Sequence, residues 1–478
     1  LFASTFEISA QIQKEFSPRF SDMINGDFTM IANNIISRTA TEDYNGENDN
    51  HSFLDNVYVD IDNDNSTFNS SSANFVNPQP QLACLTIKKA YLYWAAADKE
   101  NEAGEDNQPN WNFNDIKLML PSENTYSTLT ADDVLYRGRD THFSNDPYVC
   151  FKDITSLVIN LDSPYGKYQV ANIEAKTGFL FQHSEGNTGT SGGWQIVYIY
   201  ESPELISKNV SLFDGYAHIT KDFNNYDIGF YGFRTVPSGP VKVNTLIGAL
   251  EGDRSLIGDR FQIQNIANDY IDITAPLRDS NNFFNSRITI ENTNYTDRNP
   301  ASLNTLGFDA ALFQLNNTDN SIIGNNQSSA SIRLASNQET YSLFLIGLSV
   351  EVWAPSLYPI VLSSTAIENT TNANDIVTLD FNFSNTGNDN AVNVMLSKTI
   401  PSNIEFDSAN NLPVGVTYNY DEDTRLLQFL IENGLADIGD PPLNIQFELM
   451  VKDACYFLED TCNLAFDLQF KATYNGEE

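Results

Sequence analysis

Basic residues are scarce in this chain of 478 residues. Lysine and arginine together number 26 against 63 aspartates and glutamates, so the formal net charge at pH 7 is −37. Binding to nucleic-acid phosphates needs a basic surface, and anionic membranes attract basic side chains for the same electrostatic reason. The shortage of cations therefore argues against nucleic acid and anionic lipid as partners. The same negative charge favours solubility and the binding of divalent cations.

Long apolar segments and helix-forming runs are also missing. No stretch is long and apolar enough to cross a bilayer as a helix, so we expect no direct membrane insertion. Short segments of Val, Ile, Phe and Tyr are separated by Asn, Asp and Gly, which is the pattern of strands and turns. Aromatic residues make up 12% of the chain, enough for a buried core. The composition predicts an all-β protein.

Strand-like segments form two groups. In the first, their spacing leaves no room for crossover helices, which predicts antiparallel sheets. Its clearest segments are Phe28–Ile36, Ile87–Ala97, Tyr148–Ile159, Trp194–Glu201 and Tyr341–Trp353, while Phe6–Phe16 is ambiguous. In the second group, apolar residues alternate with polar ones over Ile376–Phe383, and six or seven short strands fit an Ig-like domain.

We therefore predict a large antiparallel β-sandwich or jelly-roll-like head over residues 1–355, followed by an Ig-like β-sandwich over residues 356–478. One continuous β domain is the alternative. The chain starts at Leu1 without an initiator Met or a signal peptide, so we expect a mature N-terminus from which an export signal was removed. It ends without an anchor, which favours the front end of a longer protein.

Cysteine is rare, and the four residues fall into two pairs: Cys84 with Cys150, and Cys455 with Cys462. An even number in an acidic β protein predicts disulfides and an oxidising compartment. The Cys455–Cys462 pair is favoured because it closes a short loop. Four buried thiols are the alternative, and no spacing resembles a zinc site.

Motifs for catalysis are lacking as well. Gly189–Gly193 matches the string G-x-S-x-G, but a strand-like segment follows it, whereas the nucleophile elbow requires a strand-to-helix turn. Paired carboxylates arise by chance among 63 acids, so they do not indicate a glycosidase. We predict no catalytic residue and no enzyme. None of the four histidines has metal-ligand spacing: His51, His142, His183 and His218.

Acidic residues alternate in one loop. Asp60, Asp62 and Asp64 place oxygens at every second position, as calcium loops do. The loop is not an EF-hand, because Asn65 stands at the sixth position and Ser71 at the twelfth. A solvated acidic loop is the alternative to a calcium site.

A second group of acids and amides lies at strand ends, in the segments 251–259, 282–286 and 307–309. Such side chains either converge on one cation or cap turns. The residues alone leave both interpretations open.

Several strings together resemble an N-terminal module of large bacterial surface proteins, in which Ig-like domains of the conserved-repeat kind follow the module. The resemblance covers roughly residues 20–355 and, with the segment 20–36 and the Asn-rich style, extends to surface proteins of Bacteroidota, including SprB-like gliding-motility adhesins exported by type IX secretion. The strings are Ala90–Trp94, Trp194–Tyr200, Leu212–Tyr216, Glu251–Asp253 with Gly258–Asp259, Phe283–Ser286 and Leu306–Asp309.

The resemblance implies a set of residues that bind a cation or lock turns: Glu251, Asp253, Asp259, Asn285 and Asp309. In that family a second acid usually follows the Gly-Phe-Asp string, but Ala311 stands there in this chain. The resemblance therefore implies a weaker site or one completed by water. It also implies a pair between Cys84 and Cys150.

The expected function is that of a non-enzymatic adhesin head at the cell surface, exported across the outer membrane and braced by calcium and disulfides. Its expected partners are a surface polysaccharide or an abiotic surface, and further Ig-like domains of the same chain. Two alternatives remain, a secreted glycoside hydrolase or lyase and a purely structural spacer. Trp111, in a polar loop, either stacks on a sugar or anchors a turn.

Overall fold

The computed structural model describes residues 12–50, 56–62, 64–97, 112–138, 147–177, 190–357, 360–364, 371–457 and 468–477. The chain divides into two compact units, Leu1–Val352 and Trp353–Glu478. Regular structure is almost entirely β, which confirms the predicted all-β sandwich class. Within the described ranges, no helix is long and apolar enough to cross a membrane.

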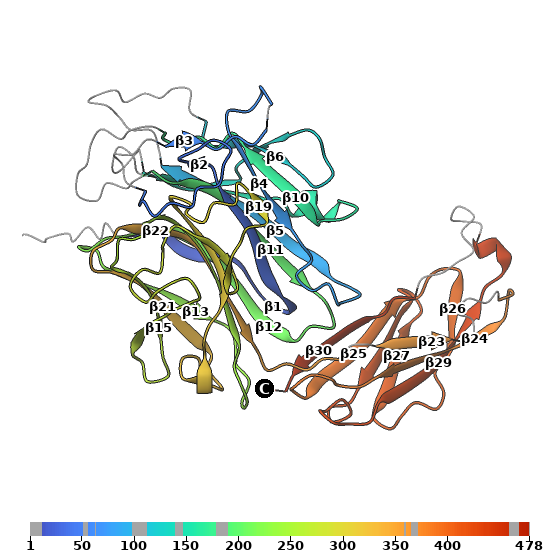
Figure 1. The fold of residues 1–478 in the computed structure, drawn as a ribbon. Helices are drawn as coiled ribbons and strands as arrows, with labels where there is room; N and C mark the ends of the chain where they lie inside the picture. The colour runs from blue at the N-terminus through green and yellow to red at the C-terminus, as the bar shows by residue number, and fades with distance from the viewer. Residues whose placement is uncertain are drawn as a thin grey trace, which may run out of the picture. The chain divides into compact units, whose positions relative to one another are not determined.

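Unit 1 is built around an eleven-stranded sheet with the order β18-β17-β20-β14-β22-β12-β1-β11-β5-β9-β8. Figure 1 shows its neighbouring strands β5, β11, β1 and β12. Its neighbours pair antiparallel, except that β17 and β20 pair in parallel. The strands are β1 (Ile12–Asn34), β5 (Thr86–Ala97), β8 (Asp133–Arg137), β9 (Pro147–Asp153), β11 (Gly192–Glu201), β12 (Ser207–Ile219), β14 (Val243–Gly252), β17 (Ile288–Ile290), β18 (Thr293–Asn294), β20 (Gly307–Gln314) and β22 (Tyr341–Glu351).

The long strand β1 joins the two halves of this sheet. Up to Asn25 it pairs with β12, and from Gly26 onward it pairs with β11. Strands that are distant in the sheet order also meet, because a side-chain carbon added at Gly193 of β11 would lie 2.6 Å from the Phe308 ring of β20. The sheet therefore folds back on itself, and its two halves face each other across an apolar core that contains Phe28, Phe308 and Phe344.

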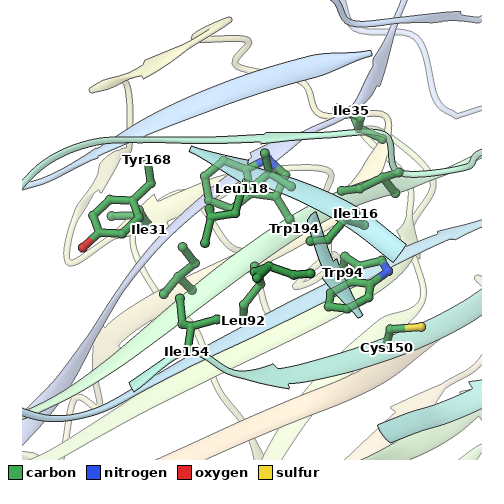
Figure 2. Packing of buried hydrophobic residues seen from close by; sticks show 14 of the residues in the cluster. Ile31, Ile35, Leu92, Trp94, Ile116, Leu118, Cys150, Ile154, Tyr168 and Trp194 are labelled. Carbon is green, nitrogen blue, oxygen red and sulfur yellow. The ribbon is translucent and has the colours of Figure 1, made fainter. Parts of the chain in front are cut away.

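A five-stranded sheet, β19-β4-β10-β6-β7, packs on the half of the large sheet formed by β1, β5, β9 and β11. Figure 2 shows the buried side chains between them, among which Trp94 and Trp194 are the largest. The indole of Trp94 donates to the Phe113 carbonyl at 2.9 Å, and that of Trp194 donates to Ser71 Oγ at 2.8 Å. The five strands are β4 (Ser70–Phe75), β6 (Asp115–Met119), β7 (Ser127–Thr130), β10 (Gly166–Ala171) and β19 (Arg298–Asn299).

A four-stranded sheet, β13-β21-β15-β16, packs on the other half through aromatic rings. The ring centroids of Phe213 on β12 and Phe230 lie 4.7 Å apart, and those of Phe261 and Phe313 on β20 lie 6.1 Å apart. The strands are β13 (Asn225–Tyr231), β15 (Asp259–Gln264), β16 (Tyr270–Asp272) and β21 (Ser329–Ser336). The remaining pair is β2 (Ile36–Ser37) with β3 (Val57–Tyr58), and η2 (Thr318–Asn320) is a 3-10 turn.

One predicted strand was partly wrong. Within Tyr148–Ile159, β9 ends at Asp153 and the short helix α1 (Thr155–Ile159) follows. The Asp153 carboxylate accepts the backbone N–H of Thr155 at 2.9 Å, which turns the chain at that point.

Unit 2 is a sandwich of two four-stranded antiparallel sheets, β23-β24-β29-β26 and β27-β28-β25-β30. The alternation predicted over Ile376–Phe383 is confirmed, because Val377, Leu379, Phe381 and Phe383 are buried in its core. The strands are β23 (Val361–Ser364), β24 (Ile376–Phe383), β25 (Ala391–Thr399), β26 (Ile404–Ser408), β27 (Val416–Asp421), β28 (Leu426–Ile431), β29 (Leu443–Val451) and β30 (Lys471–Gly476), with the 3-10 turn η3 (Ala454–Phe457).

Candidate binding groove

A groove of about 1400 Å³ opens on unit 1. Its lining comes from residues 27–31 of β1, from the segments 74–79, 240–244 and 290–297, and from residues 312–317 at the end of β20, with single residues of β11 and β12. Segments distant in the sequence therefore form one continuous depression. A groove of this size accommodates a ligand larger than a single small molecule.

Carboxamide side chains dominate the polar lining of the groove. Each amide both donates and accepts hydrogen bonds, which suits it to ligands rich in hydroxyl groups. Charged side chains are fewer and nearly balanced, with three acids and two bases. The amides are Asn74, Asn77, Gln79, Asn244, Asn292, Asn294, Gln314, Asn316 and Asn317, and the charged residues are Asp27, Lys208, Lys242, Glu291 and Asp297.

Aromatic residues also line the groove, among them Tyr200 and Tyr295. The hydroxyl of Tyr295 donates to the Asn74 carbonyl at 2.6 Å, which holds the ring in place. Burial raises the pKa of both phenols above the usual range, so both stay neutral. The lining thus combines apolar ring surface with neutral hydrogen-bonding groups.

One acid connects three strands at the groove. The carboxylate oxygen Oδ2 of Asp27 on β1 accepts from Lys208 Nζ on β12 at 2.6 Å and from Asn244 Nδ2 on β14 at 2.7 Å. Its other oxygen accepts the backbone N–H of Phe28 at 2.9 Å. The side chains of Asp27 and Lys208 are 8% and 16% exposed. A pair this buried costs desolvation energy, and the hydrogen bonds around it offset part of that cost.

The predicted acids at 60–64 are engaged by hydrogen bonds within their own loop and to neighbouring segments. Asp62 accepts from the backbone N–H of Asp64 at 3.0 Å, from Gln169 Nε2 at 2.8 Å and from the Tyr126 hydroxyl. Although burial favours its neutral form, these hydrogen bonds lower the pKa of Asp62 below its usual value. Asp60 accepts from the Ser70 hydroxyl, and Asp64 accepts the backbone N–H of Ser66. Every one of these contacts stabilises the turn.

Asp309 forms a fully buried ion pair with Arg278, with Oδ1 2.9 Å from Nη1 and both side chains 0% exposed. The same carboxylate accepts the backbone N–H groups of Ser286 at 2.9 Å and Arg287 at 3.1 Å. Asn285, another residue of the predicted set, donates to the Leu277 carbonyl at 2.8 Å.

Glu251 and Asp253 fasten the segment that contains Asn50 to the end of β14. Glu251 accepts from Asn50 Nδ2 at 3.0 Å and from Ser191 Oγ at 2.5 Å, while Asp253 accepts the backbone N–H of Asn50 at 3.0 Å. The two partner residues, Asn50 and Ser191, come from chain segments far apart in the sequence. These two acids therefore connect loops.

Asp259 is paired with Glu339, a residue for which the sequence carried no signal. Glu339 accepts the backbone N–H of Asp253, and Asp259 accepts that of Phe284 at 2.5 Å. Burial raises the pKa of Asp253 to about 7 and that of Asp259 to about 6, and repulsion from Asp49 and from Asp309 adds to these two shifts. Burial and repulsion from Asp259 and Asp253 raise the pKa of Glu339 well above its usual value. At neutral pH these carboxyl groups therefore hold at least one proton between them.

The residues of the predicted metal set make hydrogen bonds that hold turns and loops in place. Across the described part of the chain, no group of three or more His, Cys, Asp or Glu side chains is arranged to hold a metal ion. Calcium stays a prediction. Arg278 and Glu339, which complete the two acidic clusters, were not singled out in the sequence because an isolated charge in a polar loop gives no indication of burial.

The implied Cys84–Cys150 disulfide is a wrong prediction, because both residues carry free thiols. Cys150 on β9 is buried opposite Trp94, whereas Cys84 is exposed and precedes the start of β5 at Thr86. The strand from Thr86 to Trp94 is about 26 Å long, and a disulfide needs Cα atoms within about 7 Å.

Cys455 is likewise an exposed free thiol, which contradicts the expected Cys455–Cys462 bridge. Cys462 itself lies outside the described residues, as do Trp111, Gly189 and the histidines at 51, 142 and 183. His218 is buried, with Nδ1 3.0 Å from Ser342 Oγ.

No family model and no curated protein matches this chain. Among solved structures, dimeric latent PorU from Porphyromonas gingivalis is 9% identical with a TM-score of 0.21, covering 86% of this chain and 33% of that chain. The major capsid protein P2 from bacteriophage PM2 is 8% identical with a TM-score of 0.17, covering 59% of this chain and 98% of the capsid protein. A triple jelly-roll protein of an archaeal virus is 8% identical with a TM-score of 0.16, covering 90% and 89%. Likenesses this distant carry no argument about function.

Proposed function

We propose that unit 1 is a non-enzymatic binding head that takes a neutral, hydroxyl-rich polymer, such as a surface polysaccharide, in the groove. The lining of the groove carries this proposal, because nine carboxamides and several aromatic rings surround few and nearly balanced charges. Amides satisfy sugar hydroxyls in either direction, and rings cover the apolar faces of sugars.

Charge supports a neutral ligand. A molecule with a net charge of −37 repels anionic polymers as they come close to its surface, whereas an uncharged chain approaches without that cost. Single contacts of this kind are weak, so useful adhesion requires several heads to engage together.

In this proposal the chain is a surface-displayed adhesin of the gliding type, exported to the cell exterior, with unit 2 as the first Ig-like domain of a longer stalk. Calcium belongs to the proposal as a brace near Asp253. Its support is that Asp253, Asp259 and Glu339 are buried close to one another, and carboxylate oxygens are ligands that calcium prefers.

Binding of the full chain to immobilised neutral and anionic polysaccharides tests the proposal. We expect retention on at least one neutral polymer and none on anionic ones. The variant N292A/Q314A removes two exposed lining amides and should weaken binding about thirtyfold, since each of the two lost hydrogen bonds costs about 1 kcal/mol. N419A, an exposed amide of β27, is the matched control and should bind like the wild type.

The same panel separates the alternatives. Release of reducing ends or unsaturated products would indicate a hydrolase or lyase. Absence of binding to every polymer, or equal binding by N292A/Q314A and the wild type, would contradict the groove as the binding site.

A further inference from the structure

A lysine and an asparagine from two different strands both contact one carboxylate oxygen of an aspartate on a third strand. Asp27 Oδ2 lies 2.6 Å from Lys208 Nζ and 2.7 Å from Asn244 Nδ2. The amine and the carboxamide nitrogen are therefore at most about 5.3 Å apart, the sum of these two distances. One carboxyl group thus contacts both an amine and the amide that the amine is able to attack.

The strands hold these side chains in place. β12 and β14 both pair antiparallel with β22, so they run parallel to each other, and Lys208 and Asn244 are the second residues of their strands. Glu351 lies opposite Lys208 in the register, and Lys242 Nζ approaches that carboxylate at 3.5 Å. Preorganisation of this kind converts an encounter into an intramolecular reaction.

The surroundings of the aspartate and the lysine are partly apolar. Asp27 and Lys208 are largely withdrawn from water, with Phe28 next to Asp27 in the chain and Tyr200 opposite it across the strand pair.

We propose that Lys208 and Asn244 form an intramolecular isopeptide bond, with Asp27 as the general acid and base. Lys208 first passes one proton to Asp27, and its neutral Nζ then attacks Asn244 Cγ. The Cγ–Nδ2 bond breaks as Asp27 gives that proton to the departing nitrogen and takes up the second proton from Nζ, so that ammonia leaves and Asp27 ends protonated. One C–N bond forms and one breaks, with no oxidant, reductant or further reactant.

Other lysine–carboxylate pairs serve as a contrast. Lys14 pairs with Asp133, Lys88 with Glu201 and Lys152 with Asp132, each within 3.2 Å. Among the described residues, none of these three carboxylates accepts a hydrogen bond from an asparagine side chain. They lack the group that a lysine amine would attack.

The intact mass of the purified full chain tests the proposal, without any ligand for the groove. We expect a mass about 17 Da below that of the sequence, because one ammonia is lost, and one peptide pair in a protease digest joined through Lys208 and Asn244. The variants K208R, N244A and D27N should keep the full sequence mass. K242A, which changes a neighbouring groove lysine, should keep the deficit.

Full sequence mass of the wild type after prolonged incubation at neutral pH overturns the proposal, whether or not the variants fold. A deficit that persists in D27N overturns the role of Asp27, and a deficit that persists in K208R or N244A overturns the assignment of the bond.

Discussion

Individual carboxyl groups in unit 1 experience very different surroundings. Asp309 is fully buried against Arg278, whereas Asp253, Asp259 and Glu339 are buried against one another. The first arrangement pairs opposite charges, and the second is tolerable only while protons are bound. Burial nevertheless raises the pKa of Asp309 as well, so all four carboxyl groups bind protons more readily in the folded chain than in water.

The shared protons predict that unit 1 loses stability as the pH rises. The folded protein keeps protons on Asp253 and Asp259 up to pKa values of about 7 and about 6, whereas an unfolded chain releases them near pH 4. The stabilising contribution is therefore complete below about pH 4 and is lost as the pH rises through 6 and 7. Chemical denaturation between pH 5 and 8 should show a falling free energy of unfolding, by up to about 1.4 kcal/mol per pH unit for each proton.

Glu339→Gln should flatten this decline, because it removes one of the mutually repelling acids. Glu204→Gln, at an exposed position, is the control and should leave the slope unchanged. Equal slopes for wild type and Glu339→Gln would contradict the shared proton. Calcium added at pH 8 tests the proposed brace in the same measurement: stabilisation of the wild type that Asp253→Ala abolishes is expected, and no effect would refute it.

At the scale of elements, β1 shows best what local sequence misses. Only its second half was predicted as a strand, because the run Ser17-Pro18 and the pair Asn25-Gly26 are typical of turns. In the structure β1 continues through both, since pairing with β12 and then β11 outweighs local preference. Pro18 is accommodated beside a register shift, where the regular ladder is interrupted.

Local sequence patterns likewise identified individual strands but not the candidate sites. Alternation of apolar residues identified β24, and short runs of apolar and aromatic residues identified β5 and β11, because both are local signals. The groove, the pair of Asp259 with Glu339 and the contact of Asp27 with Lys208 and Asn244 all join residues distant in the sequence. They depend on how the large sheet folds back, which no local pattern encodes.

Gly26 stands where β1 changes its partner, and a side chain there is predicted to be destabilising. A carbon added at Gly26 would lie 2.0 Å from the backbone oxygen of Tyr200, a contact that requires the backbone to move. Gly26→Ala should lower the free energy of unfolding of unit 1 by about 1–3 kcal/mol, measured by chemical denaturation.

Gly229→Ala is the matched control for this prediction. A carbon added there meets the far end of the Tyr231 side chain, which is 71% exposed and free to move aside. Its effect should therefore be small. Equal stability of Gly26→Ala and the wild type would contradict the close approach of β1 to β11.

For the whole molecule, the two units have separate cores and are predicted to unfold as separate transitions. Phe381 lies at the centre of the unit 2 core, with its ring 5.4 Å from Phe447 and 4.7 Å from Phe470. Phe381→Ala should destabilise unit 2 by about 3–5 kcal/mol and leave the transition of unit 1 in place. Calorimetry of the full chain distinguishes this from a single cooperative transition that shifts as a whole, which would refute independent folding.

The net charge of the chain is −37, although the acids and bases in the groove nearly balance. This charge affects how copies of the molecule associate in solution. Like-charged copies hold each other apart, but at physiological ionic strength the Debye length is only about 8 Å, so the repulsion acts just before contact. Many copies at high concentration should therefore stay separate molecules and not aggregate. Concentrated salt or multivalent counterions, rather than high protein concentration alone, should be what brings such particles into clusters.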